Sequence, residues 1–426
     1  MSETETLQVT PELVVPFYDQ PHVHTGEIPV GPGIPFGLEQ VTHPETGLGG
    51  AYGAWGESYD NAAIKGFVEA HLGRPLGAEE LMDLSSLGFV NRHHVSGLSD
   101  DEHLELEVTL GAQLLREAAH ACGWETGEVQ GVFIGTSAPV ANDLTERIAK
   151  EAGVPDSALK VSVHKACDSS VGGLHLALNP DLPENCKLNR NIARELFGKK
   201  VLVGAVEGLS RLVNRSRDAF ALQLFGNGAG AIGLVPGITV RFLVGKDYEV
   251  FDEQGVLSVS MTYPHSGRPA EGQSLVEVSE SGENSFRVAG LMHEPEDGTS
   301  VVMAGPMGMV KLFVRTGVQV VHDVFLSYQA LMNELGASGA KIKVAIVHHA
   351  NKKINMLKAK HLENEGIHLS MPWILSEFGN VSAASNMIAF LRQLPALNPG
   401  DHVLFDGFGA GTYYDALAVE LGHLGP

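Results

Sequence analysis

The chain has 426 residues, of which 44% are hydrophobic and 19% charged, and its formal net charge is −22. This length can bury a large core, as one big domain or two of ordinary size. The negative charge argues against general nucleic-acid binding, and no apolar run is long enough to predict a membrane span.

Signals for secretion and for metal or disulfide scaffolds are missing from the sequence. The N-terminus "MSETETLQV" lacks the basic and apolar regions of a secretory signal. The three cysteines, Cys122, Cys167 and Cys186, form no CxxC pair. A disulfide framework and a structural zinc site are therefore not expected, and a reducing cytoplasm is the expected location.

The N-terminal segment 1–55 is rich in Pro and Gly, which predicts an extended arm with little regular structure. The arm also carries Phe17, Tyr18, Phe36 and Trp55. Such aromatic residues predict that the arm packs against the rest of the chain.

An α/β pattern follows, which we divide into a first half over 56–237 and a second half over 238–426. In the first half the pattern predicts a helix over 103–122, a strand over 131–137, a helix in "DLTERIAKEAGV", a strand over 160–163, a helix over about 168–179, an insertion over 180–198, and strands over 200–208 and 224–236. In the second half it predicts β structure over 238–300, a long helix over 305–335, a strand in "KVAIVHHAN", a helix in "SEFGNVSAASNMIAFLRQL" and a strand ending in a glycine turn in "HVLFDGFGAG".

The two halves look like copies of one unit. "VFIGT" at 132–136 matches "VAIVH" at 344–348 in character. Cys167 lies 31 residues after Thr136, and Asn380 lies 32 residues after His348. Duplication would therefore bring Cys167 and Asn380 to one shared seam.

Cys167 lies on a predicted strand-to-helix turn, where a helix N-terminus can lower the pKa of a thiol. Such a thiol is suited to carrying an acyl group. The next residue, Asp168, would oppose the thiolate by its charge unless its side chain points away. On this segment alone, a buried structural cysteine is the alternative.

His348 and Asn380 are less specific signals. His348 follows a predicted strand and could be an ordinary hydrogen-bonded histidine, and Asn380 could be only a turn or cap residue. No metal companion stands at ligand spacing near His348, so we expect no metal.

Taken together, the motifs resemble the β-ketoacyl-ACP synthase III branch of the thiolase superfamily, over roughly residues 76–423. Ala166-Cys167 is similar to the family's Ala-Cys, "HHAN" at 348–351 to His-Gln-Ala-Asn, and "GNVSAAS" at 379–385 to Gly-Asn-Thr-Ser-Ala-Ala-Ser. "LFGNGAGA", "MAGPMG" and "DGFGAG" resemble three further family motifs.

This resemblance implies a duplicated αβαβα thiolase-like fold with two pseudo-twofold-related halves, in a homodimer. The implied reaction is a decarboxylative Claisen condensation, with Cys167 as the acyl carrier. His348 and Asn380 would donate hydrogen bonds to the enolate oxygen. Backbone N–H groups of Cys167 and of the turn Gly409, Ala410 and Gly411 would bind the second oxyanion.

The resemblance also implies the partners: an acyl carrier protein or coenzyme A thioesters, with no cofactor besides these substrates. Four lysines are predicted to bind the carrier, with a solvated helix face as the alternative: Lys311, Lys352, Lys353 and Lys358.

Besides single-residue differences within the motifs, such as His349 for Gln, Val381 for Thr and Ala410 for Gly, the sequence departs from the family in two respects. "AEELMDLSSLG" lacks the Trp that the family pairs with an Arg to hold the adenine of coenzyme A, and Arg217 lies only near the second position. The chain is also longer than the family usually runs, which favours a specialised fatty-acid or polyketide pathway. The alternatives are an acyltransferase to a hydroxyl or amine, and a non-catalytic ketosynthase partner subunit.

Overall fold

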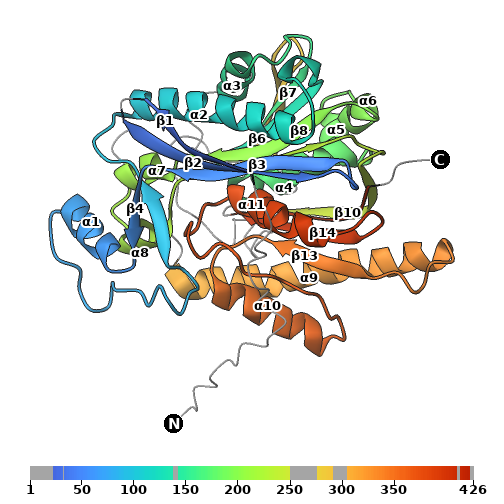
Figure 1. Cartoon of the computed structure of the whole chain (residues 1–426). Coiled ribbons are helices and arrows are strands. Elements are labelled where there is room, and N and C mark those ends of the chain that lie inside the picture. Colours follow the sequence, from blue (N-terminus) through green and yellow to red (C-terminus); the bar gives the residue numbers. More distant parts are fainter. Residues whose placement is uncertain are drawn as a thin grey trace.

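The structure is a computed structural model that describes residues 23–31, 33–137, 143–249, 276–290, 305–409 and 413–422. Its elements stack in five layers, in which helices alternate with two sheets (Figure 1). In the described part of the chain, no helix combines the length and apolarity needed to cross a bilayer.

The first sheet has nine strands. Its members are β1 (Val23–Val30), β2 (Ile34–His43), β3 (Leu48–Trp55), β6 (Gly131–Gly135), β7 (Leu159–His164), β8 (Val201–Glu207), β9 (Gly228–Leu234), β11 (Glu277–Gly282) and β12 (Ser285–Ala289). Their order across the sheet is β1-β2-β3-β9-β8-β6-β7-β12-β11. The central strands β6, β8 and β9 are buried along their whole length, as expected of strands covered on both faces.

The second sheet has four strands in the order β10-β15-β14-β13. Its members are β10 (Val240–Glu249), β13 (Ile342–Val347), β14 (His402–Gly409) and β15 (Tyr413–Leu421). A separate pair is formed by β4 (Glu57–Asp60) and β5 (Asn91–His94).

Two helices fill the layer between the sheets, α4 (Ser169–Leu178) and α11 (Ala384–Gln393) (Figure 1). Every residue of both helices is buried. Small residues on α4, such as Gly172 and Gly173, allow this close packing between two sheets. A helix that is buried all round is expected in a central layer.

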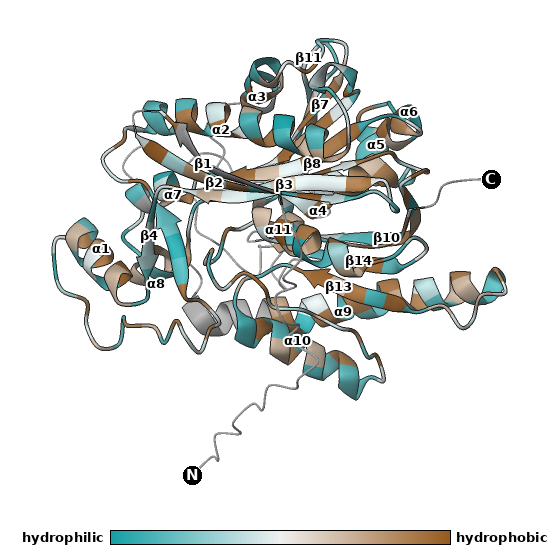
Figure 2. Cartoon of the chain, in the orientation of Figure 1, coloured by the Kyte–Doolittle hydropathy of each residue, from teal (hydrophilic) through white to brown (hydrophobic). Residues whose placement is uncertain are grey.

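The outer layers carry α2 (Asp100–Ala121) and α3 (Leu144–Ala152) on the nine-stranded sheet, and α9 (Gly305–Glu334) and α10 (Lys352–Asn364) on the four-stranded sheet (Figure 1). Hydrophilic and hydrophobic residues mix along these outer helices (Figure 2). The remaining helices are short or peripheral: α1 (Ala63–Leu72), η2 (Thr126–Glu128), η3 (Ala166–Asp168), α5 (Pro183–Lys187), α6 (Ile192–Leu196), α7 (Leu209–Arg215), α8 (Ala219–Leu224) and η4 (Leu394–Ala396).

The prediction of a largely irregular arm over 1–55 is wrong for the described residues. β1 and β2 form a hairpin that extends the nine-stranded sheet, and β3 lies inside that sheet. The glycines of β3 serve close packing rather than turns, since an added Cβ at Gly53 would collide with the carbonyl oxygen of Gly37. Phe36 and Trp55 are buried, as predicted, whereas Phe17 and Tyr18 lie outside the described residues.

The predicted duplicated, thiolase-like fold is confirmed by the architecture. β6 runs parallel to β8 in one half, and β13 runs parallel to β14 in the other. The central helices occupy equivalent places in the chain, because α4 lies between β6 and β8 and α11 lies between β13 and β14. The sheets do not follow the predicted boundary at 237/238, because β12 of the second half pairs in parallel with β7 of the first. The predicted insertion at 180–198 contains α5 and α6.

Candidate active site

The turn before α4 places Cys167 at the seam of the two halves. β7 ends at His164, and Ala166 adopts a left-handed conformation with φ of 53°. The Ser169 hydroxyl holds this turn, because it accepts from the Lys165 N–H at 2.8 Å and donates to the Ala166 carbonyl at 2.6 Å. A non-glycine residue in this conformation is strained, and such strain is frequent at active sites.

The matching turn of the second half brings Asn380 to the same place. Gly379 and Ser382 are both left-handed, with φ of 70° and 47°. The Asn380 side-chain oxygen accepts from the Ser382 N–H at 2.9 Å, which leaves the amide NH₂ as the donor end. The Ser382 hydroxyl lies 3.1 Å from the Cys167 sulfur. Ser382 therefore contacts both Cys167 and Asn380.

His348 reaches the same loop from the end of β13. Its Nδ1 lies 2.7 Å from the Ser385 hydroxyl, and its ring also hydrogen-bonds the backbone of Ser382. Phe408 packs edge-on against the imidazole at 4.9 Å. Burial, with smaller contributions from neighbouring positive groups, lowers the pKa of His348 to about 3. The imidazole is therefore neutral at pH 7, and Cys167, His348 and Asn380 all meet at Ser382.

The predicted oxyanion turn is only partly described. Gly409 ends β14 directly against the Cys167 turn, because a Cβ added to it would lie 3.1 Å from the Ala166 Cβ and 3.2 Å from the Asp168 nitrogen. Ala410 and Gly411 lie outside the described residues.

The expected low thiol pKa of Cys167 is wrong for this structure. Burial raises the pKa of Cys167 to about 12, while the Ser382 hydrogen bond lowers it and the nearby Glu207 and Asp168 raise it further. The Asp168 carboxyl lies 3.4 Å from the Lys165 ammonium and hydrogen-bonds to Asp415 of the second half. Burial and Asp415 raise the pKa of Asp168 well above its usual range, while Lys165 lowers it. The opposition to the thiolate that the sequence predicted for Asp168 is present among the causes that raise the pKa of Cys167.

Glu207 is a site residue that the sequence analysis missed. It ends the buried strand β8 and is fully buried. Its carboxylate accepts from the Ser137 N–H and hydroxyl and from the Ala383 N–H, at 2.7 to 3.1 Å. Burial raises the pKa of Glu207 to about 7. The signal in the sequence was a lone acid at the end of the apolar run "VLVGAVEG".

The predicted carrier-binding lysines do not form one surface. Lys358 is fully buried and pairs with Asp406 beneath the Phe408 ring, so its assignment to a docking surface is wrong. It lies on the inner face of α10, which packs against α9. Lys353 is exposed and Lys352 half-buried at the start of α10, and the side chain of Lys311 lies outside the description.

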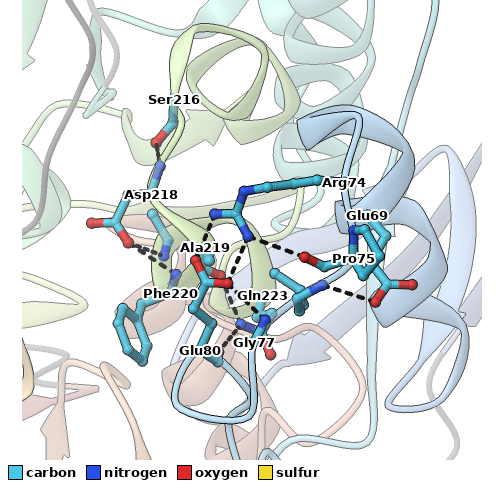
Figure 3. Close-up of polar contacts among 12 residues, drawn as sticks. Glu69, Arg74, Pro75, Gly77, Glu80, Ser216, Asp218, Ala219, Phe220 and Gln223 are labelled. Carbon is cyan, nitrogen blue, oxygen red and sulfur yellow. Dashed lines mark hydrogen bonds and ion pairs between the residues drawn. The ribbon is translucent and has the colours of Figure 1, made fainter.

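The segment 78–88, where the family's adenine-binding Trp is missing, is attached to α8 by hydrogen bonds (Figure 3). The Gln223 side chain donates to the Glu80 carbonyl at 2.7 Å, and the Arg74 guanidinium pairs with the Glu80 carboxylate at 2.7 Å. Arg217 donates to a backbone carbonyl at the end of α1. The contacts that hold the segment 78–88 against its neighbours are therefore polar.

In the described parts of the chain, no group of three or more potential ligands could hold a metal ion.

Comparison with known proteins agrees with this geometry. Residues 332–421, which contain His348 and Asn380, match the family model of the 3-oxoacyl-[acyl-carrier-protein] synthase III C-terminal domain. The chain is 25% identical over 319 residues to β-ketoacyl-[acyl-carrier-protein] synthase III of Neisseria meningitidis, covering 73% of this chain and 83% of that protein. It is 22% identical over 351 residues to the enzyme of the same name from Streptococcus equi, covering 79% and 90%.

Solved structures with the same fold include a 3-oxoacyl-(acyl carrier protein) synthase III from Pseudomonas aeruginosa, with a TM-score of 0.59, 20% identity and coverage of 91% of this chain and 99% of that one. A type III pentaketide synthase from Neurospora crassa gives a TM-score of 0.58 at 17% identity, covering 90% and 99%. The predicted resemblance to the β-ketoacyl-ACP synthase III branch of the thiolase superfamily is confirmed.

Proposed function

We propose that this chain is an acyl-thioester condensing enzyme that carries the acyl group on Cys167. The observation that carries the proposal is the meeting of Cys167, His348 and Asn380 around Ser382, at the seam of a duplicated fold. The names of the relatives support the same chemistry, since they are β-ketoacyl-ACP synthases III.

In this proposal the Cys167 sulfur gives up its proton as it attacks an acyl thioester, and the carrier leaves as a thiol. A second, β-carboxy thioester then loses CO₂, and its carbonyl becomes an enolate. His348 and the Asn380 amide donate hydrogen bonds to the enolate oxygen, and each such donor is worth on the order of 10²–10³ in rate. A neutral His348 supports this role, because decarboxylation needs a donor that does not hand its proton to the carbanion.

The carbanion then attacks the Cys167 thioester, and the backbone N–H groups of Cys167 and of the turn 409–411 bind the resulting oxyanion. Collapse of this oxyanion breaks the bond between the acyl carbon and the Cys167 sulfur, which releases the β-ketoacyl thioester and takes up a proton again. The position of Gly409 against the Cys167 turn supports this part of the proposal. The reaction uses no cofactor besides its thioester substrates.

The partner we propose is an acyl carrier protein, which docks near the start of α10 through Lys352 and Lys353. The absence of a Trp from the segment 78–88 favours a carrier over coenzyme A as the source of the acyl group. We further propose a cytoplasmic homodimer in a specialised fatty-acid or polyketide pathway. Light scattering tests the dimer, and a monomeric mass would overturn that part alone.

Mass spectrometry of the intact protein tests the function. After mixing with acyl-carrier protein or acyl-coenzyme A, we expect one acyl adduct on Cys167, absent from Cys167→Ser and retained by Cys186→Ser. Subsequent addition of a malonyl thioester should release CO₂ and a β-ketoacyl product. A Cys167 adduct that moves to an alcohol or amine without CO₂ release would identify an acyltransferase instead, and no adduct would overturn the proposal.

A further inference from the structure

Glu207 has a hydrogen-bond arrangement that the condensation mechanism does not use. The carboxylate is fully buried and 3.0 Å from the Ala383 N–H, and the Ser137 hydroxyl donates to it at 2.7 Å. The Ser382 hydroxyl also hydrogen-bonds to it. All these partners are uncharged donors that favour the charged carboxylate, whereas burial, the largest effect, favours its protonated form.

Ser382 connects this carboxylate to the Cys167 sulfur. The same hydroxyl that bonds to Glu207 lies 3.1 Å from the sulfur. A hydroxyl has one proton to donate and lone pairs that accept, so it can donate to only one neighbour at a time. The left-handed backbone of Ser382 and the bond from its N–H to Asn380 fix the hydroxyl between the two groups.

We propose that Ser382 relays the Cys167 proton to Glu207 while the sulfur forms its new bond to carbon, so that no free thiolate accumulates. The relay rests on the proposed function, in which that carbon is the acyl carbonyl of the thioester. The S–H bond breaks as the Ser382 oxygen takes that proton, and the Ser382 O–H bond breaks as its proton passes to the Glu207 carboxylate. The new S–C bond forms in the same step, so the sulfur never carries a full negative charge. When the acyl group has been transferred, the Glu207 proton returns through Ser382 and protonates the departing carrier thiol. Ser382 is thus a catalytic residue, and Glu207 acts through it as a positioning residue.

The charged groups around this relay are few. Asp168 faces Cys167 from η3, and its own pKa is raised well above the usual range. The buried Glu107–Arg211 ion pair lies one residue beyond Glu207, against Gly208. Burial keeps the pKa of Glu207 near 7. Below that pH Glu207 already holds a proton and cannot accept another. Above it the carboxylate can take the Cys167 proton during the attack, although the thiol, with a pKa of about 12, stays protonated at rest.

The test is the rate at which iodoacetamide alkylates Cys167 between pH 5 and pH 10, followed by mass spectrometry of the Cys167 peptide. The wild-type rate should rise in a step centred near pH 7 and level off before the thiol itself ionises. Glu207→Gln and Ser382→Ala should lose this step and react at least about tenfold more slowly at pH 8, because a hydrogen bond to a charged group is lost. Ser382→Gly tolerates the left-handed backbone and tests the same point if the alanine variant folds poorly.

Ser170→Ala is the matched control, since its hydroxyl donates to the Ala383 carbonyl at 2.6 Å and belongs to the same packing. It should keep the wild-type profile. Alkylation of Glu207→Gln at the wild-type rate or faster would overturn the relay, because a carboxylate that acts only by its negative charge slows thiolate formation. A pH step that survives in both Ser382 variants would also overturn it. The reagent is not an acyl thioester, so this result does not depend on whether an acyl adduct forms.

Discussion

At the scale of single residues, the adjacent histidines at the end of β13 separate into two roles. His348 contacts the loop around Ser382, whereas His349 points the other way, stacks on Trp373 at 4.5 Å and lies 3.0 Å from the Pro372 carbonyl. Burial lowers the pKa of both to about 3. Both must therefore be neutral in the folded state near pH 7, although only His348 faces the candidate site.

The neutral state of His349 predicts a pH dependence of stability. Because its folded pKa lies below the unfolded value of about 6.5, the unfolded state binds more protons below that pH and acidification destabilises the fold. Between pH 7 and pH 5 this one group costs about 2 kcal/mol. His349→Gln should reduce the pH 7 to pH 5 loss in unfolding free energy by about that amount, measured by urea titration. The exposed His368→Gln should leave the loss unchanged, and equal losses in all three proteins would contradict the prediction.

The buried pair of Lys358 and Asp406 predicts a second stability effect. Both side chains are fully buried, so removing the lysine leaves an unpaired carboxylate in the core. Lys358→Met should lower the unfolding free energy by about 3–5 kcal/mol at pH 7. The loss should shrink as the pH falls and Asp406 takes up a proton.

The control for this pair is on the same helix. Lys353→Met removes an exposed lysine from α10 and should change the unfolding free energy by less than about 0.5 kcal/mol. Similar losses for both variants in chemical denaturation would show that Lys358 stabilises the fold no more than a surface lysine does.

At the scale of elements, periodicity predicted well wherever a helix or strand has one clear apolar face. The long helix expected over 305–335 is α9 at Gly305–Glu334, and the helix expected over 103–122 is α2 at Asp100–Ala121. The arm could not be predicted in this way. Gly49, Gly50 and Gly53 read as turn residues, but in β3 they allow neighbouring backbone to approach, and that depends on strands far away in the sequence.

Those glycines predict a strong substitution effect. Gly53→Ala would place a Cβ against the carbonyl oxygen of Gly37 in the neighbouring strand β2. Since backbone atoms cannot move aside cheaply, we expect a loss of about 1–3 kcal/mol or more in unfolding free energy. Gly66→Ala, on exposed α1 with nothing within 4 Å of the new Cβ, should instead gain about 0.5–1 kcal/mol. Thermal unfolding compares the two, and a neutral Gly53→Ala would contradict the packing argument.

The candidate site, like the fold, could be predicted only where the signal is local in the sequence. Cys167, His348 and Asn380 follow recognisable strand and turn motifs, so these motifs were enough to predict them as site residues. Ser382 and Glu207 could not be assigned in this way, because their role depends on which hydroxyl and carboxylate face the sulfur across the seam. Lys358 was misplaced because its burial depends on Asp406, which comes from a strand 48 residues away.

At the scale of the whole molecule, the seam joins the halves by buried charges as well as by α4 and α11. Lys165 of the first half pairs with Asp415 of β15 in the second half, and His175 of α4 lies 2.6 Å from the same carboxylate. These contacts lie directly behind the Cys167 turn. The orientation of the halves and the position of the nucleophile are therefore set by the same contacts.

Docking of a carrier protein depends on the charge of the whole molecular surface. The net charge of −22 repels an acidic carrier protein, so productive encounter needs a local positive surface. With Lys358 buried, Lys352 and Lys353 are the predicted lysines with described side chains that remain candidates, while the side chain of Lys311 lies outside the description. The backbone N–H of Lys352 bonds to the Leu87 carbonyl at 2.9 Å beside Trp373. Lys353→Glu should lower kcat/KM for an acyl-carrier substrate by about tenfold at low salt and leave a small thioester mimic unaffected.

Lys341→Glu is the matched control, because Lys341 is also exposed but precedes β13 at the end of the strand opposite His348. It makes the same change in net charge and should lower kcat/KM for the acyl-carrier substrate much less. Exposed charges are screened by salt, so the gap between the two variants should close as ionic strength rises. Equal losses in both variants would mean that overall charge, rather than a docking surface on α10, governs the encounter. An unchanged Lys353→Glu would remove α10 from carrier recognition altogether.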